Sequence, residues 1–136
     1  MASFLTKPDY FSSIDTAVLD ALTGGNDAII DELSFEALEE MKSYLNVRFD
    51  VVQIFSQGGT NRNKTVLMYA KDIALYHIYS RSGFFPIPET RVNRYKKALS
   101  WLQDVVEQTI NPEGLPTNTK SLVKTGSNEK RINQQQ

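Results

Sequence analysis

Apolar side chains dominate residues 66–79, where only Lys71, Asp72 and His77 are neither apolar nor aromatic. At about 100° per residue, Lys71 and Asp72 share one flank of a helix and the rest of its surface is apolar. A helix that is apolar nearly all round must be enclosed by other helices. It is roughly half as long as a bilayer-crossing helix, so a membrane span is not expected. The pattern therefore predicts the central helix of a small all-α domain.

Two longer amphipathic segments flank this predicted helix. Asn26 is a favoured N-cap residue and begins a segment that we expect to be helical to about Phe49. Its apolar positions follow the helical period at Ile30, Leu33, Ala37, Leu38, Met41, Tyr44 and Leu45. The second segment opens at Pro88 or Glu89 and ends near Ile110. Its predicted core stripe is Val92, Tyr95, Leu99, Leu102 and Val106.

Shorter helices are predicted before the long ones. Thr6 is an N-cap candidate with a proline and a carboxylate in the turn that follows it. A second short helix starts at Ser13 or Asp15, turns Val18 inward and ends at Gly24. The expected architecture is an all-α bundle of four or five helices that occupies residues 1–110.

The composition limits what this domain can do. A chain of 136 residues with 40% hydrophobic content is one domain with a single core. The absence of cysteine and the single histidine exclude a disulfide framework and the usual zinc clusters, so we expect no metal and no cofactor. A net charge of -1 argues against nucleic-acid binding over the whole surface. No signal peptide pattern opens the chain, and a cytosolic protein is expected.

The composition changes at Asn111. Residues 111–136 are rich in Asn, Thr, Ser, Lys and Gln and contain few large apolar side chains. Such a segment buries too little to order itself, so we predict an extended tail that is disordered or ordered by a partner. If a partner orders this tail, the residues expected to contact the partner are Lys120, Leu122, Val123, Lys124, Lys130, Arg131 and Ile132.

Acidic residues gather on the first long predicted helix, and basic residues gather on the last one. Glu32, Glu36 and Glu39 lie on the polar side of the first long helix. Arg91, Arg94, Lys96 and Lys97 crowd the first half of the last helix, where the helix dipole disfavours cations. Trp101 falls about 140° from the middle of the predicted core stripe, and we expect it to be difficult to bury within one bundle. A solvated acidic face is the simple reading. The alternative is that Glu32, Glu36 and Glu39 meet Arg91, Arg94 and Lys97 of another copy, with Trp101 as an anchor.

Two stretches carry weak signals for other chemistry. Residues 58–65 nearly fit the phosphate-binding pattern G-x-x-x-x-G-K-[ST], with Asn63 in place of the second glycine. Residues 51–55 could form a strand before this loop, but the pattern requires a parallel sheet and no second strand is predicted. We therefore expect residues 50–63 to be an irregular, exposed and mobile link. His77 has no clearly paired nucleophile or carboxylate and is expected to be a core residue.

Three motifs in order resemble a known family. Residues 43–49 read S-Y-L-x-x-R-[FY], residues 72–79 read D-I-A-x-Y-x-I-Y, and residues 94–102 read R-Y-K-x-A-x-x-W-L. With their spacing, they resemble the Mu-like phage neck protein family, and more distantly the head-completion or head-tail connector proteins of long-tailed phages. The likeness extends over most of residues 1–110.

The resemblance implies a function without catalysis. Such subunits form a ring, of about twelve copies, beneath the portal after DNA packaging. The resemblance implies as partners other copies of the chain, the portal protein, the next neck or tail protein, and DNA passing through the bore without sequence specificity. The C-terminal segment would dock onto the portal. The expected location is the neck of the virion, and the host cytoplasm before assembly. The rival functions are a small helical regulator or DNA-binding adaptor and, less favoured, a nucleotide-binding protein.

Overall fold

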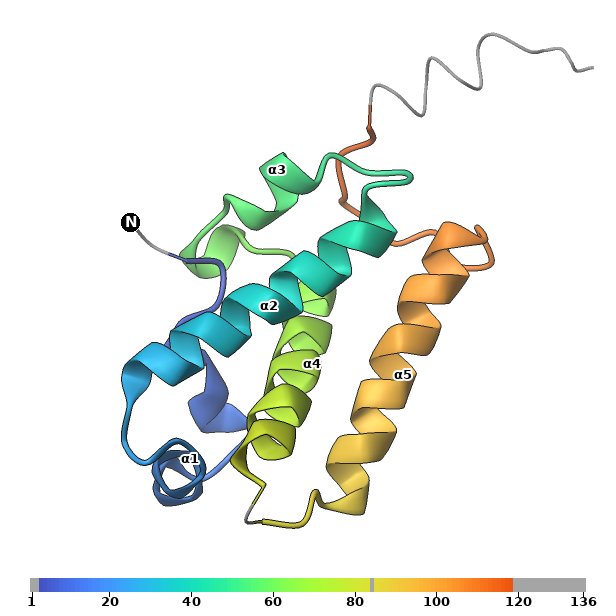
Figure 1. Ribbon diagram of the computed structural model, residues 1–136. Helices are drawn as coiled ribbons and strands as arrows, with labels where there is room; N and C mark the ends of the chain where they lie inside the picture. Colours follow the sequence, from blue (N-terminus) through green and yellow to red (C-terminus); the bar gives the residue numbers. More distant parts are fainter. Residues whose placement is uncertain (1–2, 84, 119–136) are drawn as a thin grey trace, which may run out of the picture.

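The computed structural model describes residues 3–83 and 85–118, which are all-helical (Figure 1). The α-helices are α1 (Thr16–Thr23), α2 (Asp27–Leu45), α3 (Val51–Phe55), α4 (Lys64–Ser82) and α5 (Glu89–Val106). Two 3₁₀-helices, η1 (Lys7–Ser12) and η2 (Gly59–Asn61), complete the elements. Within the described ranges the only β-type pairing is an isolated bridge between Phe49 and Thr117. The predicted all-α class is confirmed.

Helix α4 is the central element. It packs against α1, α2 and α5, and α2 crosses α4 while α5 stands alongside it (Figure 1). Its fully buried apolar residues are Val66, Ala70, Ile73, Ala74, Leu75 and Ile78. The prediction of an enclosed, mostly apolar central helix is therefore confirmed.

Polar side chains determine where the helices begin. Asp15, Asn26 and Asn63 accept hydrogen bonds from backbone N–H groups in the first turns of α1, α2 and α4. The predicted start at Thr6 is also observed, because its backbone N–H donates to the Asp9 carboxylate at 2.7 Å. The element that follows is a 3₁₀-helix, and Val18 of α1 is exposed rather than turned inward as predicted.

The expected irregular link contains a helix. Asp50 accepts a hydrogen bond from Gln53 N and caps α3, which buries Ile54 and Phe55. The Phe55 ring meets the Phe4 ring edge-to-face at 4.9 Å between centroids. Residues 51–55 are therefore helical, not a strand, and the preceding helix α2 ends at Leu45 rather than near Phe49.

Helix α5 buries a different face from the one predicted. Its buried residues are Ala98, Trp101, Leu102 and Val105, whereas the remaining members of the predicted stripe are only partly buried. Trp101 is 7% exposed and stacks on Tyr69 of α4 at 4.8 Å between ring centroids. The expectation that this indole is difficult to bury within one bundle is wrong, because α4 supplies an aromatic face for it.

The chain after α5 turns back onto the other helices. The Arg48 guanidinium donates to Val105 O at 2.8 Å and to Asn111 Oδ1 at 2.8 Å. Backbone hydrogen bonds then join Asp50 N to Pro116 O and Asn118 N to Arg48 O, each at 2.9 Å. Residues 111–118 thus lie against the helical body, which differs from the expectation of a free segment from Asn111 onward. All seven residues proposed for portal docking, Lys120 to Ile132, lie outside the described residues.

Candidate functional site

A buried carboxylate on α4 faces the cationic edge of α5. Arg91 Nη1 and Arg94 Nη1 each lie 3.7 Å from Asp72 Oδ1. Burial raises the pKa of Asp72 above its usual value, although Arg94, Arg91 and two lysines oppose this. The arginines therefore have a negative partner within their own chain. The sequence reasoning missed this partner because Asp72 lies on another helix.

The cations of α5 differ in their availability. The Arg91 side chain is only 14% exposed and donates through Nη2 to Ser13 O at 2.7 Å, so it is held inside its own chain. The Arg94 side chain is 57% exposed, and Lys97 is also exposed. Of the predicted interface cations, Arg94 and Lys97 are the ones that another molecule can reach.

The acidic residues of α2 form an open face. Glu32, Glu36 and Glu39 are all exposed, and Glu39 pairs with Lys42 at 2.9 Å. Phe35, on the same side of α2, is 59% exposed. Among the described residues, no ion pair joins this acidic face to Arg94 or Lys97. A single chain therefore keeps the two charged surfaces apart.

A groove of ≈ 340 Å³ runs between α4 and α5. Its lining residues are Met68, Tyr69, Asp72, Thr90, Asn93, Arg94 and Lys97. Met68 and Tyr69 give it an apolar part, whereas Arg94 and Lys97 place positive charge at its edge. The groove combines an apolar surface with cations, as expected of a site that receives an acidic, partly apolar partner.

Glu40 connects three helices. Its carboxylate contacts His77 Nε2 at 2.9 Å and accepts a hydrogen bond from the Tyr95 hydroxyl at 3.0 Å. His77 is therefore half-buried beside a carboxylate, which corrects the expectation of an unpaired core histidine. Burial and the Glu40 hydrogen bond raise the pKa of Tyr95 to about 12. Tyr76 stacks on Tyr95 at 4.1 Å between ring centroids, so the cluster contributes to packing between α2, α4 and α5.

The loop with the partial phosphate-binding pattern has a structural role. Arg62 donates to Phe4 O and to Asp9 Oδ2, each at 2.8 Å. Burial disfavours the ionised form of Asp9, but hydrogen bonds from Arg62 and Thr6 outweigh it and lower the pKa. The glycines of the loop are exposed as expected, whereas Arg62 is not. Asn63 caps α4, and no strand precedes the loop, so the context that a nucleotide site requires is missing from the described residues.

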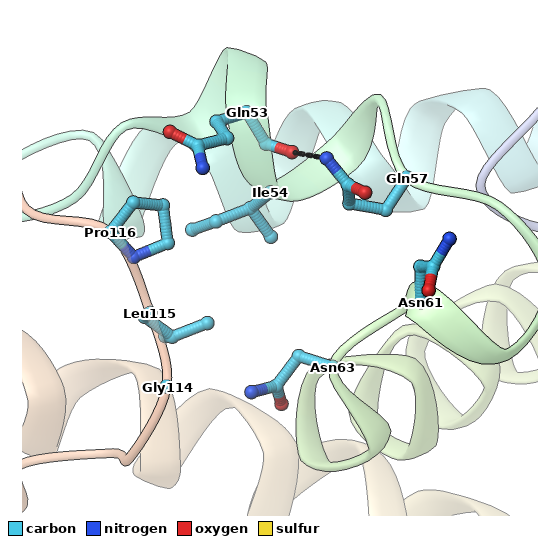
Figure 2. Close-up of a pocket in the computed structure, with 8 residues that line it drawn as sticks. All are labelled: Gln53, Ile54, Gln57, Asn61, Asn63, Gly114, Leu115 and Pro116. Carbon is cyan, nitrogen blue, oxygen red and sulfur yellow. Dashed lines mark hydrogen bonds between the residues drawn. The ribbon is translucent and has the colours of Figure 1, made fainter.

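A small cavity of ≈ 200 Å³ lies beside this loop (Figure 2). Gln53, Gln57, Asn61 and Asn63 bring carboxamide groups to it, and residues 114–116 close the opposite side. Gln57 Nε2 donates to Gln53 O at 3.1 Å, and Asn63 Nδ2 donates to Glu113 O at 3.2 Å. Two of the amides therefore fix the surrounding backbone, and the cavity marks the junction between the loop and the C-terminal segment.

These features define a small all-α protein whose acidic and cationic surfaces lie on different helices. No helix in the described ranges has the length and apolar character to span a membrane. The chain belongs to the bacteriophage Mu Gp36 family, whose sequence model matches residues 4–133. It is therefore a phage protein, and the resemblance to Mu-like phage proteins is confirmed. Comparison with curated proteins and with solved structures finds no match.

Proposed function

We propose that the protein is a structural head-tail connector subunit that forms a ring under the portal of a tailed phage. The observation that carries the proposal is the family match over residues 4–133, together with the three motifs that resemble neck proteins. DNA passes through the bore of this ring without sequence-specific contacts. The protein acts by binding other proteins rather than by catalysis.

The segregated charges support self-assembly. Glu32, Glu36 and Glu39 are exposed on α2, and Arg94 and Lys97 are exposed on α5. A head-to-tail contact joins one surface of a copy to a different surface of the next copy, and repetition of that contact gives a ring when the rotation between copies closes. Complementary charges on the two surfaces orient the copies and speed their encounter.

The exit of the C-terminal segment supports docking on the portal. Asn118 Nδ2 donates to Asn46 O at 2.7 Å, which places the last described residues beside the exposed Val47. Val52 of nearby α3 is 76% exposed. The end of α2, helix α3 and the last described residues share one end of the molecule (Figure 1). We propose that this end faces the portal and the opposite end faces the next neck or tail protein.

Native mass measurement of the protein alone and mixed with portal protein tests the proposal. The expected result is a closed multimer of the chain on the portal. A chain that remains monomeric in both samples would reject the connector function. Salt-dependent binding of duplex DNA by that monomer would instead favour the DNA-binding adaptor. Stabilisation of the monomer by magnesium-ATP would favour nucleotide binding.

A further inference from the structure

Phe35 is the most exposed aromatic side chain in the described part of the chain, at 59%. Its neighbours on the surface of α2 are the residues three and four positions away. Asp31, Glu32 and Glu39 occupy three of these four positions, and all three are exposed. An exposed aromatic ring with carboxylates at three of its four neighbouring positions is an unfavourable surface for a monomer. It is a suitable anchor for a partner that supplies an apolar pocket with a cationic edge.

The groove between α4 and α5 has these properties. Met68 is 41% exposed and lies with Tyr69 in the lining of the ≈ 340 Å³ space. Arg94 and Lys97 lie at its α5 side, and both are exposed to solvent. The negative charge of Asp72 is buried, so the accessible charge of the groove is positive.

The Phe35 side chain cannot reach the α4–α5 groove of its own chain. Asp72 lines the groove, whereas His77 contacts Glu40 of α2. Five residues along a helix correspond to a rotation of about 140°. Helix α2 therefore covers a different side of α4 from the side that opens into the groove. Phe35 lies on the exposed surface of α2, so only a second molecule can bring a Phe35 to the groove.

We propose that Phe35 of one copy inserts into the α4–α5 groove of the next copy. The carboxylates beside Phe35 then face Arg94 and Lys97 of the receiving copy. This inference rests on the proposed connector function and identifies the contact that builds the ring. Each copy donates one Phe35 and offers one groove, so the contact is head-to-tail and repeats around the ring. Phe35 takes the anchor role that the buried Trp101 cannot fill.

Cysteine pairing tests the geometry directly, because the chain contains no cysteine. Glu36→Cys places a thiol next to Phe35, and Asn93→Cys places one at the groove. When the two single variants are mixed under oxidising conditions, alone and with portal protein, we expect a disulfide-linked dimer of one chain of each kind. A mixture of Glu36→Cys with Val18→Cys, an exposed position on α1 outside the groove, is the matched control and should not form such a pair.

A substitution measures the contribution of the Phe35 side chain to assembly. Phe35→Asp is expected to weaken assembly by about tenfold or more, the effect of losing a central anchor. Val18→Asp on α1 removes an exposed apolar side chain outside both the groove and the proposed portal-facing end, so it should leave self-assembly unchanged. Both variants should keep the wild-type melting temperature, because both side chains are exposed.

The outcomes separate this inference from the proposed function. A wild-type chain that assembles while the cysteine pair stays unlinked, or while Phe35→Asp assembles equally well, would overturn the Phe35 contact and leave the connector function standing. A wild-type chain that stays monomeric alone and with portal protein would overturn both. The inference is supported when the pair forms and Phe35→Asp fails to assemble.

Discussion

Trp101 cannot be both a buried core residue of the monomer and an exposed anchor for another copy. An indole at a subunit interface is exposed in the monomer, whereas Trp101 is 7% exposed and stacks on Tyr69. We expect Trp101→Ala to lower the free energy of unfolding by about 3–5 kcal/mol, because it leaves a cavity between α4 and α5. Urea denaturation checks this value, and Trp101→Phe should lose less. A stable Trp101→Ala chain with impaired assembly would return the residue to the interface.

The Tyr95 hydroxyl gives the fold a dependence on alkaline pH. Its pKa is about 12 in the folded chain, against 10.0 for an unperturbed tyrosine. Between these values the unfolded chain releases the proton and the folded chain keeps it, so stability falls as the pH rises through this window. We expect the stability advantage of the wild type over Tyr95→Phe to be constant below about pH 10 and to shrink from there to pH 12. Melting temperatures of both proteins over this pH range measure it. An unchanged difference at pH 12 would contradict the raised pKa.

At the scale of elements, the signals that act within one turn of helix were readable from the sequence. Asp15, Asn26 and the pair Thr6 and Asp9 identify helix starts because a side chain needs only its neighbours to cap a backbone N–H. Gly24 ends α1 at φ 64°, a conformation that glycine adopts without strain. These local rules account for the order and approximate bounds of α1, α2, α4 and α5.

Signals that depend on other elements were not readable. The buried face of α5 is set by Tyr69 of α4, which stacks on Trp101, and no periodicity within α5 reports that contact. The cations of α5 have their partner in Asp72, two helical turns from the start of α4. Phe35 did carry a signal, since it is an aromatic residue outside the apolar stripe of its helix. Its relation to the α4–α5 groove required the packed structure.

The segment after α5 yields a prediction about its two parts. Residues 111–118 are held by hydrogen bonds from Arg48, Asp50 and Asn63, so removing them leaves these groups without those partners. We expect truncation after Ile110 to lower the free energy of unfolding by about 1–3 kcal/mol. Truncation after Asn118 should keep the wild-type value, which urea denaturation can establish.

The same pair of truncations improves the test of portal docking. A chain that ends at Asn118 keeps the packed segment and lacks only the residues proposed to bind the portal, such as Leu122 and Ile132. We expect this chain to fold normally and to lose portal binding in a co-sedimentation assay. Full binding by this chain would show that the portal contacts the helical body instead.

At the scale of the whole molecule, a net charge of -1 conceals two strong local surfaces. In the proposed ring, the acidic face of α2 attracts the cationic edge of α5 on a neighbouring copy. Charges at an interface act over about 10 Å at 0.1 M salt and about 3 Å at 1 M. Self-assembly should therefore weaken as salt increases, even though the apolar contribution of Phe35 remains.

Charge exchange separates specific pairing from a general effect of net charge. The variant Arg94→Glu with Lys97→Glu should fail to assemble, because its groove repels the acidic face. Adding Glu32→Lys and Glu36→Lys restores both the net charge and the complementarity, so the fourfold variant should regain assembly in analytical ultracentrifugation.

A matched control keeps the net charge of the fourfold variant and removes its complementarity. Here Lys64 and Arg81, which are exposed cations outside the α4–α5 groove, become glutamate in place of Arg94 and Lys97. Combined with Glu32→Lys and Glu36→Lys, this control has a cationic face opposite a cationic groove, so it should remain monomeric. If it assembles as well as the fourfold variant, net charge rather than the α2-to-groove contact controls the association of copies.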